Sequence, residues 1–160
     1  MLRIDLRSRD AGYHSITLEP SPEEVGLEPN DFREILVDVG LDYDGKQALV
    51  NLSASAVASL ICDRTLAEFE QGIRGEYTVL YTTAEGDEAV DEVRRLAASD
   101  EEIDITEIVR DTLLLSIPVR KIAPGAEEAD IPVAFGKPPD EDIDPRWEAL
   151  KALKNANGDT

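Results

Sequence analysis

The side chains that most often carry out chemistry are scarce in this sequence. His14 is the only histidine and Cys62 the only cysteine. A nucleophilic cysteine needs a base, a group that orients the base and an oxyanion site, and nothing near either residue in the sequence supplies them. Most structural zinc sites use four Cys or His ligands, and the chain has two such residues in total. We therefore expect no catalytic residue, no metal and no cofactor.

Carboxylates and glycines give no further sign of an enzyme. The chain holds 35 Asp and Glu residues, so paired carboxylates occur throughout and identify no acid–base or metal site. Gly72 and Gly75 lie in a strand-like context, and no Gly-Lys-Ser/Thr follows them, which excludes a phosphate-binding loop of that type. This composition indicates a protein that acts by binding.

The net charge of −19 limits the partners that such a protein could bind. An acidic surface repels phosphate backbones, which disfavours binding to DNA and general electrostatic binding to any nucleic acid. The acidity could attract a basic protein, or it could keep the chain soluble in a salty cytoplasm, and the sequence leaves both readings open. Arg3, Arg7 and Arg9 make the first ten residues locally basic.

The number of cysteines and the hydropathy of the chain indicate the cellular compartment in which the protein works. A single cysteine rules out an internal disulfide and agrees with a reducing environment. No apolar run approaches the ~20 residues of a membrane span. The first residues alternate charged and apolar types and lack the apolar block of a secretory signal. We expect a cytoplasmic protein with no membrane association.

The elements that position these residues are predicted to be mainly strands. From residue 33 to residue 83 the apolar pattern has a period of two, as in strands with one buried face. Asp44-Gly45 predicts a hairpin with a type I′ turn. Around Cys62, two registers remain open, with either Val57, Ser59 and Ile61 or Ala58, Leu60 and Cys62 on one face. The predicted inward-facing positions elsewhere are Ile35, Val37, Val39, Leu41, Ala48, Val50, Leu52, Ala54, Ile73, Tyr77, Val79 and Tyr81.

Shorter elements flank this region. Residues 2–6 and 16–18 read as short strands, and the proline-containing residues 19–24 read as a loop. Residues 88–98 could form a short charged helix.

One helix stands out, over residues 104–117. Asp104 is a suitable N-cap, Glu107 completes a capping-box pattern, and Pro118 disfavours helical geometry at the residue before it. The apolar side of this helix should cover the core of the sheet. Its apolar residues are Ile105, Ile108, Val109, Thr112 and Leu113, widened by Leu114, Leu115 and Ile117.

The chain is predicted to be one α+β domain, residues 1–122, with a tail. The domain should contain a mainly antiparallel sheet, which could curl into a barrel-like form, packed by the one main helix. Residues 123–160 are acidic and proline-rich, and we expect a flexible tail that ends in a short helix over 145–154. Asp144 caps that helix, Pro145 suits its first position, and Trp147 belongs to its apolar stripe.

Three segments taken together resemble a known family. They are residues 60–66 (Leu-Ile-Cys-Asp-Arg-Thr-Leu), residues 103–119 around the main helix, and residues 144–154 (Asp-Pro-Arg-Trp-Glu-Ala-Leu-Lys-Ala-Leu-Lys). In this order they resemble the YceD family of bacterial and plastid proteins, described as large ribosomal RNA subunit accumulation proteins. The resemblance implies a non-enzymatic factor that 23S rRNA needs in order to accumulate during large-subunit biogenesis.

The chain departs from the family at its cysteines. Many relatives carry Cys-x-x-Cys at the first segment and a second cysteine pair after the Leu-Pro segment, which implies a metal clip in them. Here Cys62 matches the first cysteine, Thr65 stands at the second, and residues 120–130 contain none. No metal is therefore carried over, and we expect packing alone to hold this loop. Arg64 and Leu66 match the family pattern.

Two binding modes follow from these residues, and the sequence does not decide between them. In the first, a convergent basic patch contacts 23S rRNA or its precursor. In the second, the acidic surface and the terminal helix, with Arg146 and Trp147, hold a basic ribosomal protein. An acidic protein-binding adaptor unrelated to ribosomes is the alternative. The candidate binding residues are Arg3, Arg7, Arg9, Cys62, Arg64, Leu66, Arg120, Lys121, Arg146 and Trp147. The basic patch would consist of Arg3, Arg7, Arg9, Arg64, Arg120 and Lys121.

Overall fold

The computed structural model describes residues 1–83, 93–97 and 100–128, which belong to one compact unit, Met1–Ala129. Of the predicted tail, residues 123–160, only residues 123–128 are described; the rest, with its predicted helix and with Arg146 and Trp147, lies outside the described residues. No helix in the described part of the chain is long and apolar enough to cross a membrane.

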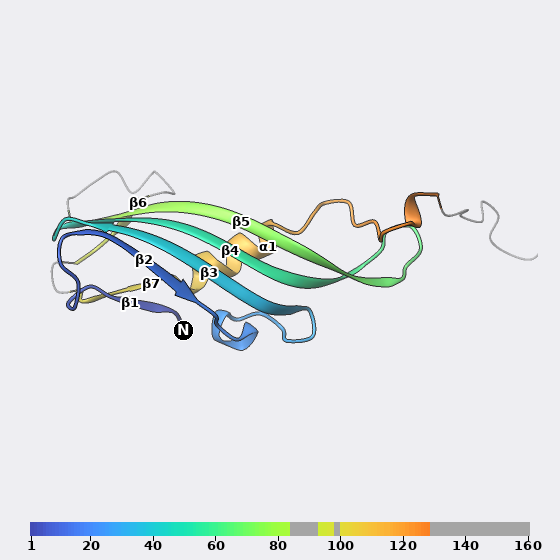
Figure 1. Cartoon of the computed structure of the whole chain (residues 1–160), viewed down its shortest axis with the longest axis horizontal. Helices are drawn as coiled ribbons and strands as arrows, with labels where there is room; N and C mark the ends of the chain where they lie inside the picture. The colour runs from blue at the N-terminus through green and yellow to red at the C-terminus, as the bar shows by residue number, and fades with distance from the viewer. Residues whose placement is uncertain (84–92, 98–99, 129–160) are drawn as a thin grey trace, which may run out of the picture. The chain divides into compact units, whose positions relative to one another are not determined.

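A five-stranded sheet forms most of this unit, with the strands in the order of the sequence (Figure 1). The strands are β2 (Gly12–Leu18), β3 (Phe32–Tyr43), β4 (Gln47–Ile61), β5 (Glu68–Thr82) and β6 (Val93–Arg95). All neighbours are antiparallel except β5 and β6, which are parallel. The prediction of a mainly antiparallel α+β fold is confirmed. The barrel-like form is wrong, because β2 and β6 are two separate edges of an open sheet.

The predicted alternation of the long strands is confirmed. Val37, Val39 and Leu41 of β3 are at most 1% exposed, and the inward positions of β4 are buried in the same way. Near Cys62, the register with Ala58, Leu60 and Cys62 inside is the observed one, since these three residues are buried while Ile61 is 55% exposed.

A second, two-stranded sheet connects the N-terminal residues to the segment that leads into the helix. β1 (Arg3–Asp5) pairs antiparallel with β7 (Glu102–Asp104), and Ile4 faces Ile103 in the core. The Leu2 N–H donates to Thr106 Oγ1 at 2.7 Å. The N-terminal strand is thus attached directly to the first turn of the helix.

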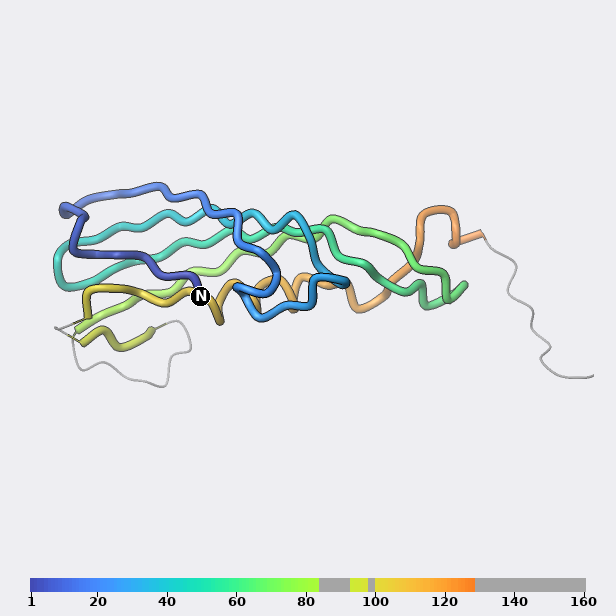
Figure 2. Tube along the Cα trace, turned by 90° about the horizontal axis from the view of Figure 1, so that it is seen from below, coloured from blue at the N-terminus to red at the C-terminus, as the bar shows by residue number. Residues whose placement is uncertain are grey.

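The helix α1 (Thr106–Leu115) covers one face of β4 and β5 (Figures 1 and 2). Its buried residues Ile108, Val109, Thr112 and Leu113 are those predicted, whereas Leu114 and Leu115 are exposed and do not widen the packed face.

The ends of α1 differ from the prediction. Asp104 belongs to β7, although its carboxylate still accepts the Thr106 N–H at 2.9 Å. The capping box does not form, because Glu107 lies instead within 3.7 Å of Arg94 and Arg110. The helix ends at Leu115, two residues before the predicted end, where the Ser116 hydroxyl donates to the Thr112 carbonyl.

Three local predictions are corrected. The hairpin after β3 is a longer loop, in which only Gly45 has positive φ and the Asp44 carboxylate accepts the N–H groups of Lys46 and Gln47. The predicted loop at 19–24 overlaps the 3-10 helix η1 (Pro22–Val25). Residues 93–95 of the predicted charged helix form β6, and residues 88–92 and 98 of that prediction lie outside the described part.

Candidate functional site

The loop between β4 and β5, residues 62–67, carries three of the predicted site residues. Cys62 is buried, its N–H donates to the Ala67 carbonyl and its carbonyl accepts the Leu66 N–H, each at 2.9 Å. These two bonds close a tight turn at the end of two long strands. We call residues 62–67, with the segment 119–128 that faces them, the strand-end site.

The Cys62 thiol is a hydrogen-bond acceptor at the centre of this site. The Ala123 N–H donates to its Sγ at 3.3 Å. This bond, followed by one from the Thr65 side chain, lowers the pKa of Cys62 from its usual 9.0 to about 7, against the opposing effect of burial. Thr65, at the position where the resemblance implies a second cysteine, therefore contributes a hydrogen bond to the sulfur.

The segment 119–128 is fastened to the loop by further hydrogen bonds. The Asp63 N–H donates to the Lys121 carbonyl and the Lys121 N–H donates to the Asp63 carboxylate, both at 2.7 Å. The Arg64 guanidinium donates to the backbone carbonyl of Glu127, in the 3-10 helix η2 (Ala126–Glu128). The expectation that packing alone holds this loop is wrong, since four hydrogen bonds cross between the two segments.

The strand-end site does not fit a metal ion. Cys62 is its only thiol, and the group that faces the sulfur is a backbone N–H, which donates a hydrogen bond and cannot act as a ligand. No group of three or more His, Cys, Asp or Glu side chains among the described residues could hold a metal. What the site can offer is shape, apolar contact and charge.

Leu66 is held in an unusual conformation at this site. Its φ is 58°, in the left-handed region that a leucine rarely adopts, and its side chain is 77% exposed. Ile61 and Val119, each within two residues of the Asp63–Lys121 hydrogen bonds, are 55% and 101% exposed. A strained backbone that presents an apolar side chain to solvent is a common property of binding sites.

The N-terminal arginines lie elsewhere and are engaged with acids. Arg3 is 3.2 Å from Glu102 and Arg7 is 2.7 Å from Glu101, while Arg9 donates to the Asp5 carbonyl. Exposed pairs of this kind contribute little stability, but they offset the local positive charge.

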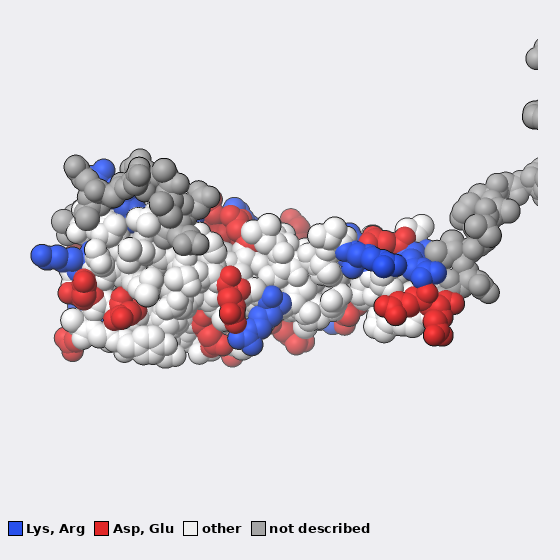
Figure 3. All heavy atoms as spheres, turned by 90° about the horizontal axis from the view of Figure 1, so that it is seen from above, with Lys and Arg blue, Asp and Glu red and all other residues white. Residues whose placement is uncertain are grey.

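These arginines cannot join Arg64, Arg120 and Lys121 in one patch. Arg9 precedes β2, whose first residue pairs with Tyr43 beside the β3–β4 hairpin, whereas Arg64 follows the far end of β4. The 15 residues of β4 therefore separate Arg9 from Arg64, which is about 50 Å, while Arg3 lies in β1, opposite Asp104, just before α1 begins. The predicted convergence is wrong, and Figure 3 shows basic side chains interspersed with acidic ones.

The same geometry separates His14 from Cys62. His14 pairs with Leu41 in the hairpin half of the sheet, and its Nε2 lies 2.8 Å from the Asp10 carbonyl. Leu41 in turn faces Val50, twelve residues before Cys62 along the chain, or about 40 Å for an extended strand. A Cys–His pair within the chain is excluded.

Sequence reasoning missed two features. Ala123 and Glu127 act on the strand-end site through backbone groups, which leave no trace in residue type. A groove of about 190 Å³ beside β5 is lined in part by Arg94, which the sequence placed in a helix. The signal that could have found it is Val93, which has the β-branched side chain typical of a short strand.

Comparison with known proteins gives one match. The model of a family described as "Large ribosomal RNA subunit accumulation protein YceD" matches residues 50–154, a range that contains β4 from Val50 onward, β5, α1 and the whole strand-end site. No curated protein and no solved structure matches the chain.

Proposed function

Because the chain belongs to the YceD family, we propose that it supports the accumulation of 23S rRNA in the large ribosomal subunit, and that it does so by binding rather than by catalysis. The observation that carries the proposal is the family match over residues 50–154, whose description names large ribosomal RNA subunit accumulation.

The strand-end site is the surface we assign to this function. It presents Leu66 on a strained backbone, with Ile61 and Val119 exposed beside it and Arg120 and Lys121 in the same segment. Exposed apolar side chains suit a folded RNA–protein surface better than bare phosphate, because the net charge of −19 works against a purely electrostatic contact.

A second candidate is an acidic adaptor that holds a basic protein outside ribosome assembly. The net charge of the chain favours it. The two candidates predict different cellular consequences, so one experiment separates them.

The experiment is depletion of the protein in its own host, with quantification of 23S against 16S rRNA and of the ribosomal subunits. We expect a selective loss of 23S rRNA and of large subunits. Balanced rRNA and a normal subunit profile would reject the proposal and leave the adaptor.

Complementation of the depleted host then tests the site. A Leu66→Ser variant should restore less 23S rRNA than the wild type, since it removes the presented apolar group. A Leu49→Ser variant is the control, because Leu49 is 37% exposed near the β3–β4 hairpin, away from the strand-end site. Equal recovery of 23S rRNA with both variants would show that Leu66 has no part in the function.

A further inference from the structure

β5 has an edge that is open for most of its length. On one side it pairs with β4 from Glu68 to Thr82 without interruption. On the other side β6 covers only Leu80, Tyr81 and Thr82. Within the described part of the chain, no strand pairs with β5 on that side before Leu80, although Phe69, Glu70 and Gln71 line a groove together with residues 122–125.

The direction of the backbone groups along this edge follows from two hydrogen bonds. The Thr82 carbonyl accepts the Leu96 N–H on the β6 side, and the Ala67 carbonyl accepts the Cys62 N–H on the β4 side. Successive residues of a strand point their N–H and C=O groups to opposite sides. Since the register with β4 is unbroken, the even-numbered residues, Arg74, Glu76 and Thr78 among them, direct these groups at the open edge.

The usual protections of an edge strand are few here. Residues 68–79 contain no proline and no lysine, and no bulge interrupts their pairing with β4. Proteins commonly use such features to prevent an edge from pairing with another chain. What the edge does carry is charged side chains on its exposed face.

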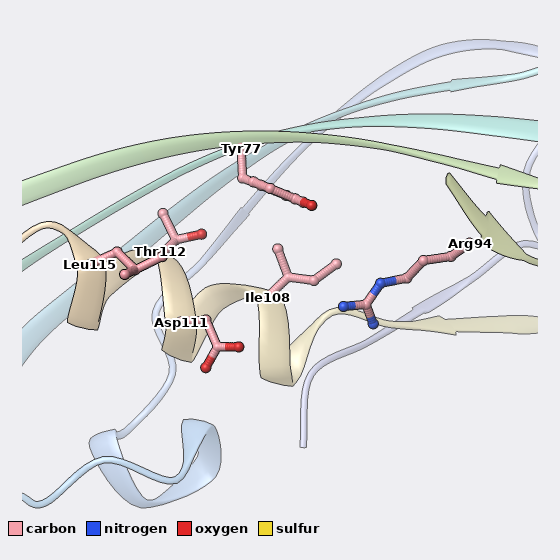
Figure 4. A pocket seen from close by; sticks show the side chains of 6 residues that line it. All are labelled: Tyr77, Arg94, Ile108, Asp111, Thr112 and Leu115. Carbon is pink, nitrogen blue, oxygen red and sulfur yellow. The ribbon is translucent and has the colours of Figure 1, made fainter. Parts of the chain in front are cut away.

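A groove runs below the edge, between β5 and α1 (Figure 4). Its volume is about 190 Å³. On the helix, Ile108, Asp111, Thr112 and Leu115 follow one another at the spacing of a single face, and Leu115 is 86% exposed. Tyr77 and Arg94 complete the lining.

The charges around the edge favour a basic occupant. Its exposed charged side chains are Glu68, Glu70, Arg74 and Glu76. Glu70 already pairs with Arg33 and Glu76 with Arg74, so Glu68 and the net charge of −19 are what attract a basic segment. Arg94, the base in the groove, already lies 3.7 Å from Glu107. An added strand with basic residues outward and apolar residues inward would match both the edge and the groove.

We propose that the open edge of β5, with the groove below it, is a docking site for an extended, basic segment of another protein. The segment adds as a strand in line with β6, exchanges backbone hydrogen bonds with Arg74, Glu76 and Thr78, and places alternate apolar side chains against Tyr77, Ile108 and Leu115. The residues that the segment contacts, from Arg74 to Thr78 on β5 and from Ile108 to Leu115 on α1, lie outside the strand-end site, so the proposal stands whether or not the partner belongs to ribosome assembly.

The test uses the full chain and a peptide of about ten residues in which Lys and Val alternate. One control peptide has the same composition with Lys and Val in two blocks, and another replaces Lys by Glu. We expect the alternating Lys/Val peptide to bind at least about tenfold more tightly than either control, with an affinity that falls as salt rises. Equal binding of the block peptide would overturn the proposal, because it would reduce the contact to bulk electrostatics.

Two variants at one position test the backbone contact. Thr78→Pro removes an edge-facing N–H, which a strand edge tolerates, while Thr78→Val keeps it. Both variants lose the bond from the Thr78 hydroxyl to Asn51. We expect Thr78→Pro to weaken peptide binding about tenfold relative to Thr78→Val. A tenfold weakening corresponds to about 1.4 kcal/mol, which is what the loss of one backbone hydrogen bond costs. Equal binding by the two folded variants would overturn the proposal.

Hydrogen exchange of the wild-type protein gives a readout that needs no variant. The amides of Arg74, Glu76 and Thr78 should exchange fast in the free protein and become protected when the alternating peptide is added. Slow exchange in the free protein would overturn the proposal, because the edge would already be covered. If the exchange in the free protein becomes slower as the protein concentration rises, the occupant of the edge is a second copy of the chain.

Discussion

At Cys62, a thiol is buried among hydrogen-bond donors. The Ala123 N–H and the Thr65 side chain stabilise the thiolate and hold the pKa at about 7. A buried cysteine without such donors would have a raised pKa. The hydrogen bonds that hold segment 119–128 to the β4–β5 loop therefore depend in part on the charge state of the Cys62 sulfur.

This link gives the fold a dependence on pH above neutrality. The pKa of Cys62 is about 7 in the folded chain, below the usual 9.0 expected after unfolding. A depressed pKa contributes stability that is present above the unfolded value and is lost as the pH falls through the folded one. We expect the free energy of unfolding of the wild type to rise, relative to Cys62→Ala, between about pH 7 and pH 9. Urea denaturation across this range measures the difference, and parallel curves for the two proteins would contradict it.

Gly75 is a second single residue with a structural role. A Cβ at this position would lie 2.2 Å from Ser116 Oγ and 3.0 Å from the Thr112 carbonyl oxygen, which is backbone. The last turn of α1 can approach β5 this closely because Gly75 has no side chain.

The matched glycine of the same strand is Gly72, where a Cβ would meet nothing within 4 Å. We expect Gly75→Ala to lower the free energy of unfolding by about 1–3 kcal/mol, since the helix must move away from the sheet. Gly72→Ala should be neutral or slightly stabilising. Denaturation of both variants checks this, and equal effects would show that α1 does not pack tightly at Gly75.

At the scale of elements, the long strands were predictable from sequence because their pattern is set by burial. From Ile35 to Leu41 and from Ala48 to Ala54 every second residue is apolar and buried, and Asp38, Asn51 and Ser53 lie between them, in the way that a sheet with one buried face requires. The buried face of α1 was predictable for the same reason, through a period of 3.6 residues.

Other elements depend on contacts between distant residues. β6 and β7 have three residues each and form only because β5 and β1 are there to pair with them. The tight approach at Gly75 and the hydrogen bond from Ala123 to Cys62 are likewise tertiary, and neither has a local signal in the sequence. The separation of the arginines into two groups could be seen only once the strand lengths were known.

For the whole molecule, the excess of acids over bases sets the response to salt. A net charge of −19 on 160 residues makes the folded chain repel itself. We expect Tm to rise as NaCl increases from about 0.05 M to about 0.5 M, where the Debye length falls to a few ångströms. Thermal denaturation followed by circular dichroism measures this, with sucrose at matched osmolality as a control for effects other than screening. A constant or falling Tm would mean that ion pairs such as Arg7–Glu101 outweigh the repulsion.

The pairing of β1 with β7 has a consequence for the order of events during synthesis. Arg3 and Glu102 form an ion pair although 99 residues separate them in the chain. β2 to β5 can assemble as successive hairpins while the polypeptide is still leaving the ribosome, but the first strand must wait until residues 102–106 have emerged. The earliest part of the chain to be made is therefore among the last to find its place, and a nascent chain stopped before residue 102 would lack the partner strand of β1.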